Sequence, residues 1–431
     1  MDGLTTKNIL ILSDAFPPAF NPRMGYLCKY LPDFGWNTFI LTEFVKQNIY
    51  NNLSNNNYTN YLNFYWSKKG KINKLKYIFV FLADFFFNYK DIVFTQKAKK
   101  IIKHNNILLI LASVSWKAFP ALTAKRLGKK YKIPYMVDFR DIYEQFPNHE
   151  YTSKNFLKSS FINKSVATLI QKKYKIQRNK IIESANAVST ISEWHTQKLK
   201  EWNQNTHLIY NGFDADLFYF KPMKSEIFKI TYTGRIESEA IKDPTLLFEA
   251  ITYLIKNKTI TSDKLKLQFY LLNQSSKIII EKITEKYNLT NYVAIFDSVE
   301  NEKIPDILNE SSILLLLANT TIGDKTPKGI MGTKVFEYIA VEKPVLCVRN
   351  DNSCLEKTIN ETKSGTSAST IEEVVEFFWD KYKEWEENGF THQNINKHVI
   401  EKYSRKYQAK QFVDIFEKLV KSCCTQNTLI I

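Results

Sequence analysis

Short runs of apolar residues alternate along the chain with longer segments whose apolar positions follow helical spacing. The runs at 8–13, 37–42, 107–112, 135–139, 187–191 and 207–210 predict buried strands, and a second series follows at 229–232, 265–271, 292–296, 313–317 and 345–348. Strands that alternate with helices form parallel sheets. The pattern therefore predicts an α/β protein with two Rossmann-like, doubly wound βαβ domains.

The polar stretch that separates the two series marks the domain boundary. At 431 residues the chain is long enough for two hydrophobic cores. We expect an N-terminal domain over 1–215 and a C-terminal domain over 216–400. A closing segment over 401–431 is amphipathic at 403–420, and we expect it to pack back on the N-terminal domain.

Two segments of the N-terminal half have unusual composition. Residues 48–63 are rich in Asn and predict an exposed loop. Residues 77–87 (Y-I-F-V-F-L-A-D-F-F-F) are strongly apolar, too short to span a bilayer, and flanked by lysines on both sides. An interfacial membrane contact and a helix buried in the domain core both fit this pattern.

Charge is divided unequally between the halves. The net charge is +16, but residues 1–213 hold 31 Lys/Arg against 13 Asp/Glu, and residues 214–431 hold 29 against 31. This asymmetry indicates that the N-terminal half meets an anionic membrane surface or a nucleic acid, unless it reflects a Lys-rich composition alone.

The chain shows no sign of a metal site, a membrane span or a secretion signal. Its five cysteines and six histidines have no metal-ligand spacing, and reduced thiols are expected. The first thirty residues lack a signal-peptide pattern. We expect a cytoplasmic protein, and a peripheral position at the inner face of the cell membrane stays open.

The stretch 329–344 (G-I-M-G-T-K-V-F-E-Y-I-A-V-E-K-P) predicts a loop, a short helix and a strand. Gly332 and Thr333 stand at the helix mouth, and Pro344 ends the helix. A helix N-terminus holds phosphate, and Glu337, one turn inside, can accept hydrogen bonds from ribose hydroxyls. An ordinary core helix with a solvent-facing glutamate fits the stretch equally well.

A second polar stretch follows the predicted strand at 135–139. Asp138, Arg140 and Asp141 stand at the carboxyl end of that strand, where ligands of doubly wound sheets bind. An internally paired salt bridge explains the same residues.

Six stretches and one further lysine resemble one known family in their order and spacing. They are I-L-I-L-S-D-A-F-P-P with Arg23 and Gly25, D-F-R-D at 138–141, A-N-A-V-S-T-I-S at 185–192, I-Y-N-G-F-D at 209–214, Y-T-G-R at 232–235, Lys242, and G-T-K-V-F-E-Y-I-A-V-E-K-P at 332–344. Together they resemble GT-B glycosyltransferases, most similar to glycosyltransferase family four. This resemblance covers nearly the whole chain and implies two domains facing across a cleft.

The resemblance implies a role for each matching residue. In the C-terminal domain, Gly332 and Thr333 lie at the diphosphate of a nucleotide-sugar donor and Glu337 at its ribose. Arg235 and Lys242 neutralise the leaving diphosphate. In the N-terminal domain, Arg23 and Gly25 line the cleft, and Asp138 and Arg140 are the catalytic candidates on the acceptor side.

The sequence departs from the family at one position. Family four pairs two glutamates as E-x7-E, and the first, which holds the donor sugar, falls on Gly329. Asp324 or Lys328 from the neighbouring loop could replace it. The identity of the donor sugar is therefore open.

We expect a hexosyltransferase-like enzyme that moves a sugar from a nucleotide sugar to a glycan or lipid-linked glycan during surface polysaccharide synthesis. The resemblance implies retention of configuration and neither metal nor other cofactor; the Asp-Ala-Asp at 214–216 fits the interdomain turn better than a metal site. The alternatives are a nucleotide-sugar epimerase, a non-catalytic relative, and a protein that binds nucleic acid or another anionic surface.

Overall fold

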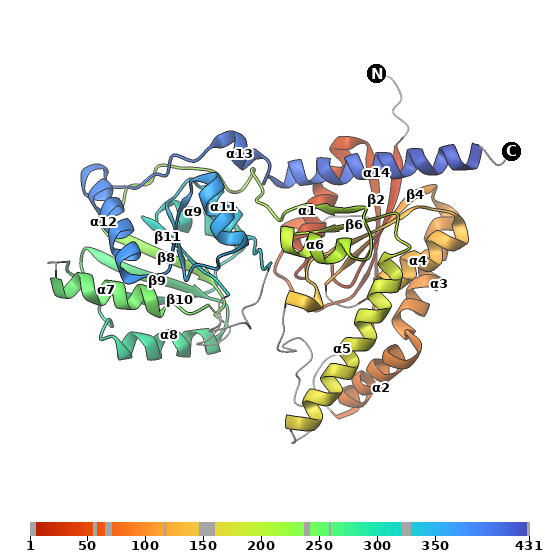
Figure 1. The fold of residues 1–431 in the computed structure, drawn as a ribbon, viewed down its shortest axis with the longest axis horizontal. Coiled ribbons are helices and arrows are strands. Elements are labelled where there is room, and N and C mark those ends of the chain that lie inside the picture. Colours follow the sequence, from red (N-terminus) through yellow and green to blue (C-terminus); the bar gives the residue numbers. More distant parts are fainter. Residues whose placement is uncertain are drawn as a thin grey trace. The chain divides into compact units, whose positions relative to one another are not determined.

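The chain forms two compact domains (Figure 1). The computed structural model describes residues 6–54, 58–64, 71–115, 118–145, 160–236, 242–257, 260–319 and 329–428. The N-terminal domain comprises Met1–Tyr210 together with Arg405–Ile431, and the C-terminal domain comprises Asn211–Ser404. These divisions fall within five residues of those expected from the sequence, after 215 and 400.

The N-terminal domain is built on a seven-stranded parallel sheet in the order β3-β2-β1-β4-β5-β6-β7. Its strands are β1 (Lys7–Ser13), β2 (Trp36–Glu43), β3 (Thr59–Leu62), β4 (Ile107–Val114), β5 (Tyr135–Phe139), β6 (Ala187–Thr190) and β7 (Thr206–Leu208). Its α-helices are α1 (Pro22–Tyr30), α2 (Lys71–Phe87), α3 (Tyr89–His104), α4 (Ala121–Tyr131), α5 (Ser160–Ile182), α6 (Glu193–Lys200) and α14 (Arg405–Thr428), with short 3-10 turns η1 (Leu31–Phe34), η2 (Asn51–Leu53) and η3 (Tyr143–Gln145).

Alternate residues of the central strands enter two separate cores. In β1, Leu10 and Leu12 face the helices α3, α4 and α5, whereas Ile9 and Ile11 face α1 and α14. Successive side chains of a strand point to opposite faces of the sheet. The unbroken apolar run in β1 therefore reflects burial on both faces.

Helix α14 returns from the C-terminal domain and completes the second of these cores. Phe412 and Phe416 are buried there, and the Phe416 ring lies 5.5 Å from the ring of Trp36 in β2. Lys7 adds an ion pair to Glu417 at 2.6 Å. The prediction that the closing segment packs on the N-terminal domain is confirmed.

The C-terminal domain is built on a six-stranded parallel sheet in the order β10-β9-β8-β11-β12-β13. Its strands are β8 (Phe228–Gly234), β9 (Leu265–Leu271), β10 (Val293–Asp297), β11 (Ile313–Leu317), β12 (Val345–Val348) and β13 (Gly365–Ala368). Its helices are α7 (Thr245–Asn257), α8 (Gln274–Lys286), η4 (Asn301–Lys303), α9 (Ile304–Asn309), α10 (Lys334–Ala340), α11 (Cys354–Thr362), α12 (Ile371–Asn388) and α13 (Lys397–Glu401).

The sequence pattern missed one edge strand in each sheet. The Asn-rich segment expected to be a loop contains η2 and the four-residue strand β3, which pairs with β2. Strand β13 (G-T-S-A) pairs with β12 and has no apolar run. Edge strands such as these are short and partly solvated, so they carry little hydrophobic signal.

Phe416→Ala is expected to lower the free energy of unfolding by about 3–5 kcal/mol, because it opens a cavity between α14 and the sheet. Equilibrium urea denaturation followed by far-ultraviolet circular dichroism measures the loss. Lys410→Ala, at an exposed position of the same helix, is the control and should change stability by less than about 0.5 kcal/mol. A loss below about 1 kcal/mol for Phe416→Ala would show that α14 does not complete this core.

Candidate functional site

The carboxyl ends of β8 and β11 form the natural ligand position of the C-terminal sheet. Chain order runs outward from β8 through β9 and β10 on one side, and outward from β11 through β12 and β13 on the other. The reversal between β8 and β11 is a topological switch point, where ligands of doubly wound sheets bind. A ligand is therefore expected at the segments that follow these two strands.

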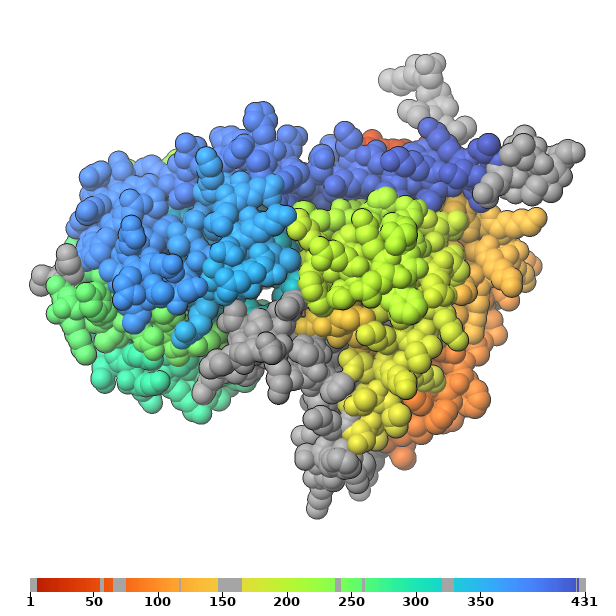
Figure 2. Space-filling view, viewed as in Figure 1, coloured from red at the N-terminus to blue at the C-terminus, as the bar shows by residue number. Residues whose placement is uncertain are grey.

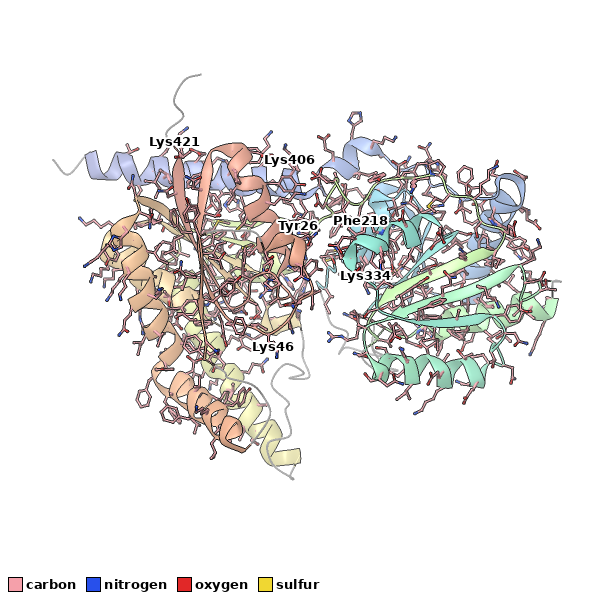
Figure 3. The ribbon with its side chains drawn as sticks, turned by 180° about the vertical axis from the view of Figure 1, so that it is seen from behind. Tyr26, Lys46, Phe218, Lys334, Lys406 and Lys421 are labelled. Carbon is pink, nitrogen blue, oxygen red and sulfur yellow. The ribbon has the colours of Figure 1, made fainter. Side chains whose placement is uncertain are left out.

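At the end of β8, Gly234 receives the side chain of Lys334 from α10 (Figure 3). Gly234 has a φ of +137°, and a Cβ atom built on it would overlap the Lys334 Nζ. The same ammonium lies 4.6 Å from the ring centroid of Tyr232. Backbone conformation and close approach both require glycine here, and the missing side chain leaves room for the cation.

A second lysine, Lys242, contacts the backbone of the next residue, Arg235. The Arg235 carbonyl accepts hydrogen bonds from the Tyr232 hydroxyl at 2.8 Å and from the Lys242 Nζ at 3.3 Å. The Arg235 side chain is exposed, and Lys242 is half-buried. The Lys242 ammonium thus lies at the backbone of Arg235, and the roles predicted for the two residues stay a prediction.

The pKa of Lys334 is lowered by burial and by the neighbouring positive charges. Partial removal of the ammonium from water, followed by the charges of Lys242 and Arg235, lowers that pKa from 10.5 to about 7. Glu337 acts in the opposite direction. Three basic side chains therefore face a common region, and one of them is close to losing its proton at neutral pH.

Neighbouring side chains fix the elements that carry these cations. The Tyr338 hydroxyl of α10 lies 3.4 Å from the Thr233 nitrogen and 3.3 Å from its Oγ1, which joins α10 to β8. Burial raises the pKa of Tyr338 to about 12, so the phenol stays neutral. Asp243, next to Lys242, caps the start of α7 through the Thr245 nitrogen at 2.9 Å and pairs with Arg349 at 3.3 Å.

The remaining predicted donor residues lie on the same segment. Gly332 is exposed, and a Cβ atom built on it would meet nothing within 4 Å. Thr333 precedes α10, and Glu337 stands one turn inside that helix, half-buried. Helix α10 has only seven residues, so its dipole is weak. The nearby cations therefore attract an anion more strongly than the dipole of α10 does.

The backbone conformation explains the glycine at position 329, where the first glutamate of the family pair was expected. Gly329 is buried and has a φ of +71°, a conformation that strains residues with a side chain. Asp324 and Lys328, the suggested substitutes, lie outside the described residues.

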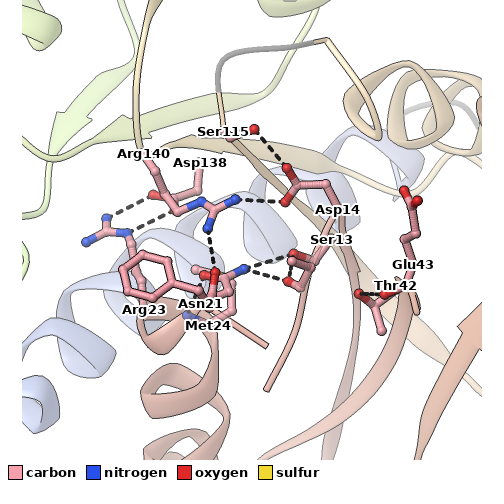
Figure 4. Close-up of polar contacts among 12 residues, drawn as sticks. Ser13, Asp14, Asn21, Arg23, Met24, Thr42, Glu43, Ser115, Asp138 and Arg140 are labelled. Atoms are coloured by element: carbon pink, nitrogen blue, oxygen red, sulfur yellow. Dashed lines mark hydrogen bonds and ion pairs between the residues drawn. The ribbon is translucent and has the colours of Figure 1, made fainter. Parts of the chain in front are cut away.

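In the N-terminal domain, Arg23 and Asp138 form a buried ion pair (Figure 4). The Arg23 Nε and Nη2 donate to the two Asp138 oxygens, each at 2.9 Å, and the Ser189 hydroxyl adds a hydrogen bond of 2.7 Å. Arg23 also donates to the Tyr210 carbonyl. Both side chains are buried, so this pair joins α1, β5 and β6 internally rather than presenting a free carboxylate.

Arg140 and Asp14 form a second, more accessible pair (Figure 4). The Arg140 Nη2 donates to the Asp14 Oδ1 at 2.8 Å, and the Ser115 hydroxyl donates to the other Asp14 oxygen at 2.8 Å. The two side chains remain 17% and 24% exposed. These residues follow β1, β4 and β5, so they stand at the carboxyl edge of the N-terminal sheet.

Packing within the N-terminal domain accounts for Gly25. A Cβ atom on Gly25 would come within 2.7 Å of the Pro17 side chain and 3.0 Å of Leu53. Gly25 and Arg23, predicted to line a cleft, are thus both buried and engaged inside their own domain.

The described residues contain no group of three or more His, Cys, Asp and Glu placed to hold a metal ion. Asp214, the first acid of the Asp-Ala-Asp stretch, is buried, and its Oδ1 accepts a hydrogen bond from the Asp216 nitrogen at 3.4 Å. That contact closes a local turn.

Lys334 is the residue that the sequence analysis missed. It stands between Thr333 and a run of core residues, where a lysine normally marks a solvated helix face. The available signal was the glycine after β8, since a glycine at a strand end indicates close approach of another group. Only the fold identifies Lys334 as that group.

Comparison with known proteins identifies the fold. The sequence matches no protein-family model and no curated protein. Among solved structures, the fold is similar to sucrose-phosphate synthase from Thermosynechococcus elongatus (TM-score 0.62, 14% identity, 96% of this chain and 100% of that chain). It is also similar to a glycosyltransferase from Rickettsia africae (0.62, 15%, 97% and 99%) and to Anabaena HepE in complex with UDP (0.60, 12%, 95% and 100%). The predicted GT-B fold is confirmed.

Lys334→Met is expected to raise the free energy of unfolding at pH 7 by about 1 kcal/mol or more, since each unit of pKa difference corresponds to about 1.4 kcal/mol. The folded-state pKa of about 7 lies below the ordinary 10.5, so between these values the unfolded chain binds a proton that the folded chain lacks. The stability of the unsubstituted protein therefore rises with pH across this window.

The gain from Lys334→Met should shrink between pH 7 and pH 9.5 when urea denaturation is repeated at both values. Lys282→Met, at an exposed lysine of α8, should give no pH-dependent difference. A pH-independent gain would show that Lys334 keeps its ordinary pKa.

Proposed function

We propose that this protein is a GT-B glycosyltransferase that takes its donor sugar from a nucleoside diphosphate. The observation that carries the proposal is the convergence of Arg235, Lys242 and Lys334 at the carboxyl end of β8. The known proteins of similar fold support it, because they include a sucrose-phosphate synthase and HepE, which was solved with UDP.

The arrangement of cations suits the chemistry of the leaving group. A nucleoside diphosphate departs with developing negative charge, and fixed cations stabilise that charge in the transition state. Arg235 supplies a planar fork for two phosphate oxygens, and Lys242 supplies a point charge. Lys334 is held against Gly234, so a neighbouring phosphate would raise its pKa again and hold its proton in place.

The segment before α10 is suited to the rest of the donor. The space beside Gly332 leaves the backbone accessible to a diphosphate, and Glu337 is in position to accept hydrogen bonds from ribose hydroxyls. Thr333 can contribute its hydroxyl, since it makes no side-chain cap to α10. The buried Gly329 offers no group to the sugar, so sugar recognition falls to other residues.

On the acceptor side we place Arg140, with Asp14 as its orienting partner. Asp138 acts as a positioning residue, because its oxygens are occupied by Arg23 and Ser189. We propose transfer to a glycan or lipid-linked glycan of a surface polysaccharide at the inner face of the cell membrane. A retaining reaction, in which the acceptor attacks the face that the diphosphate leaves, needs no protein nucleophile.

A panel of nucleoside diphosphates and nucleotide sugars, including UDP, tests the donor site by thermal shift. A ligand at one hundred times its Kd stabilises the folded state by about 2.7 kcal/mol. Arg235→Ala and Glu337→Ala should each reduce the affinity by about tenfold or more, since each removes a charged hydrogen-bond partner.

Lys282→Ala is the matched control for the panel, because it removes an exposed lysine of the same domain far along the chain from the site. Its shifts should equal those of the unsubstituted protein. The donor-site proposal fails if no nucleotide stabilises the protein, or if the control loses as much affinity as Arg235→Ala.

Arg140→Gln is expected to lower kcat for sugar transfer by about a hundredfold while leaving the nucleotide thermal shift unchanged, because Arg140 lies outside the donor domain. Transfer to membrane glycolipid extracts is measured with the nucleotide sugar that the panel identifies. Nuclear magnetic resonance of the product then gives its anomeric configuration.

Retention is expected in that product, and inversion would overturn the retaining proposal. An epimerase would instead convert the free nucleotide sugar with no acceptor present. If Arg140→Gln weakened donor binding as much as it slowed transfer, Arg140 would not act on the acceptor.

A further inference from the structure

Helix α2 of the N-terminal domain exposes a continuous apolar stripe. Its members recur at spacings of three and four residues and are 45–69% exposed: Leu75, Ile78, Phe79, Leu82 and Phe86. This spacing places them on one face of the helix. The run of residues 77–87, for which burial in the core was one interpretation, is therefore buried on one side only.

Side chains beside and opposite the stripe fix α2 to its own domain. Val80 is buried, and the Phe85 ring lies 6.1 Å from that of Tyr174 in α5. The Lys173 ammonium of α5 stands 3.9 Å from the Phe85 centroid. Helix α2 is therefore packed against its own domain, and the stripe stays exposed in the folded protein.

Helix α5 continues this surface beside α2 (Figures 1 and 2). Val166, Leu169 and Ile176 are exposed on it. Lys172 and Lys180 are also exposed and fall on the same helical face. Aliphatic side chains and lysines therefore share the exposed face of α5, and we name the exposed faces of these two neighbouring helices the α2–α5 face.

Almost all the charge around the α2–α5 face is positive. Residues 75–104 and 165–182, which lie in α2, α3 and α5, contain eleven Lys or Arg against two acids, Asp84 and Asp91. Three of the eleven form ion pairs with acids elsewhere in the domain, Lys90 with Glu43 and both Lys175 and Arg178 with Glu144. Asp91 is buried and accepts from the Thr123 hydroxyl at 2.8 Å, and Asp84 accepts from the Lys90 nitrogen at 3.0 Å. The other eight basic residues are all lysines and outnumber these two acids, so the net charge of this region is positive.

The mixture of apolar side chains and lysines favours a bilayer over a protein as the partner of the α2–α5 face. Protein–protein interfaces are depleted in lysine at their centres, whereas the lysines here lie among the apolar side chains. At a bilayer surface, aromatic and aliphatic groups enter the acyl boundary while lysines extend to anionic headgroups. In the part of the chain that the structure describes, no helix is both long and apolar enough to cross a membrane.

We propose that the α2–α5 face is a docking surface for an anionic lipid bilayer. The stripe of α2 enters the interface, with Phe79 and Phe86 as its largest anchors, and the lysines of α5 contact the headgroups. The inference that docking delivers a lipid-linked acceptor rests on the proposed function, whereas membrane binding itself is measurable without any donor or acceptor.

Vesicle flotation of the full chain tests the docking surface. Vesicles of phosphatidylcholine with about 30 mol% phosphatidylglycerol are compared with pure phosphatidylcholine at low and high salt. We expect binding to the anionic vesicles that salt weakens. Phe79→Ser/Phe86→Ser should reduce the partition coefficient by about tenfold or more, and Lys172→Gln/Lys180→Gln by about fivefold for each lysine.

The control is Tyr253→Ser/Leu272→Ser in the C-terminal domain, where the two side chains are 52% and 62% exposed, against 69% and 62% for the phenylalanines. It should float like the unsubstituted protein. Circular dichroism melts and the nucleotide thermal shift show that each variant is folded, and an unchanged nucleotide shift separates failure of docking from failure of the donor site.

Two results would overturn the proposal. The first is equal flotation of the control and the Phe79→Ser/Phe86→Ser variant, or no flotation on anionic vesicles at low salt. The second is a dimer in sedimentation analysis that this variant converts to monomer, since the face would then be an interface between two copies of the chain.

Discussion

Parallel pairing of every described strand is the constraint on which the rest of the molecule depends. In a parallel sheet all carboxyl ends lie at one edge, so residues far apart in the sequence are gathered there. In the C-terminal sheet this edge brings Lys334 of α10 against Gly234, which lies one hundred positions earlier in the chain. In the N-terminal sheet it unites Asp14, Ser115 and Arg140.

The apolar runs predicted most of the fold because burial on both faces leaves an unbroken signal, as in β1 and β11. The same physics explains the failures. Strand β13 is made of small residues at the sheet edge, so it had no run to detect. Arg235 and Lys242 were found through family motifs, which mark local segments, whereas Lys334 acquires its importance from its distance to Gly234, a property of the folded chain alone.

Two sequence ambiguities were resolved by structural features that no local pattern contains. Asp138 fitted both a catalytic acid and an internal salt bridge, and its partner proved to be Arg23, 115 residues away. Breaking such a buried pair leaves a charge without compensation, which is strongly unfavourable. Gly329 fitted a lost sugar-binding acid, and its left-handed backbone shows that the local conformation itself favours glycine.

The return of α14 to the N-terminal domain has a consequence for synthesis on the ribosome. Residues 1–210 emerge first, yet the core around Trp36 lacks Phe412 and Phe416 until residues 405–428 have been made. The C-terminal domain, whose residues are contiguous, can close its own core earlier. Domains usually fold in the order in which they emerge, and this topology reverses that order: the first domain to be translated is the last to be completed.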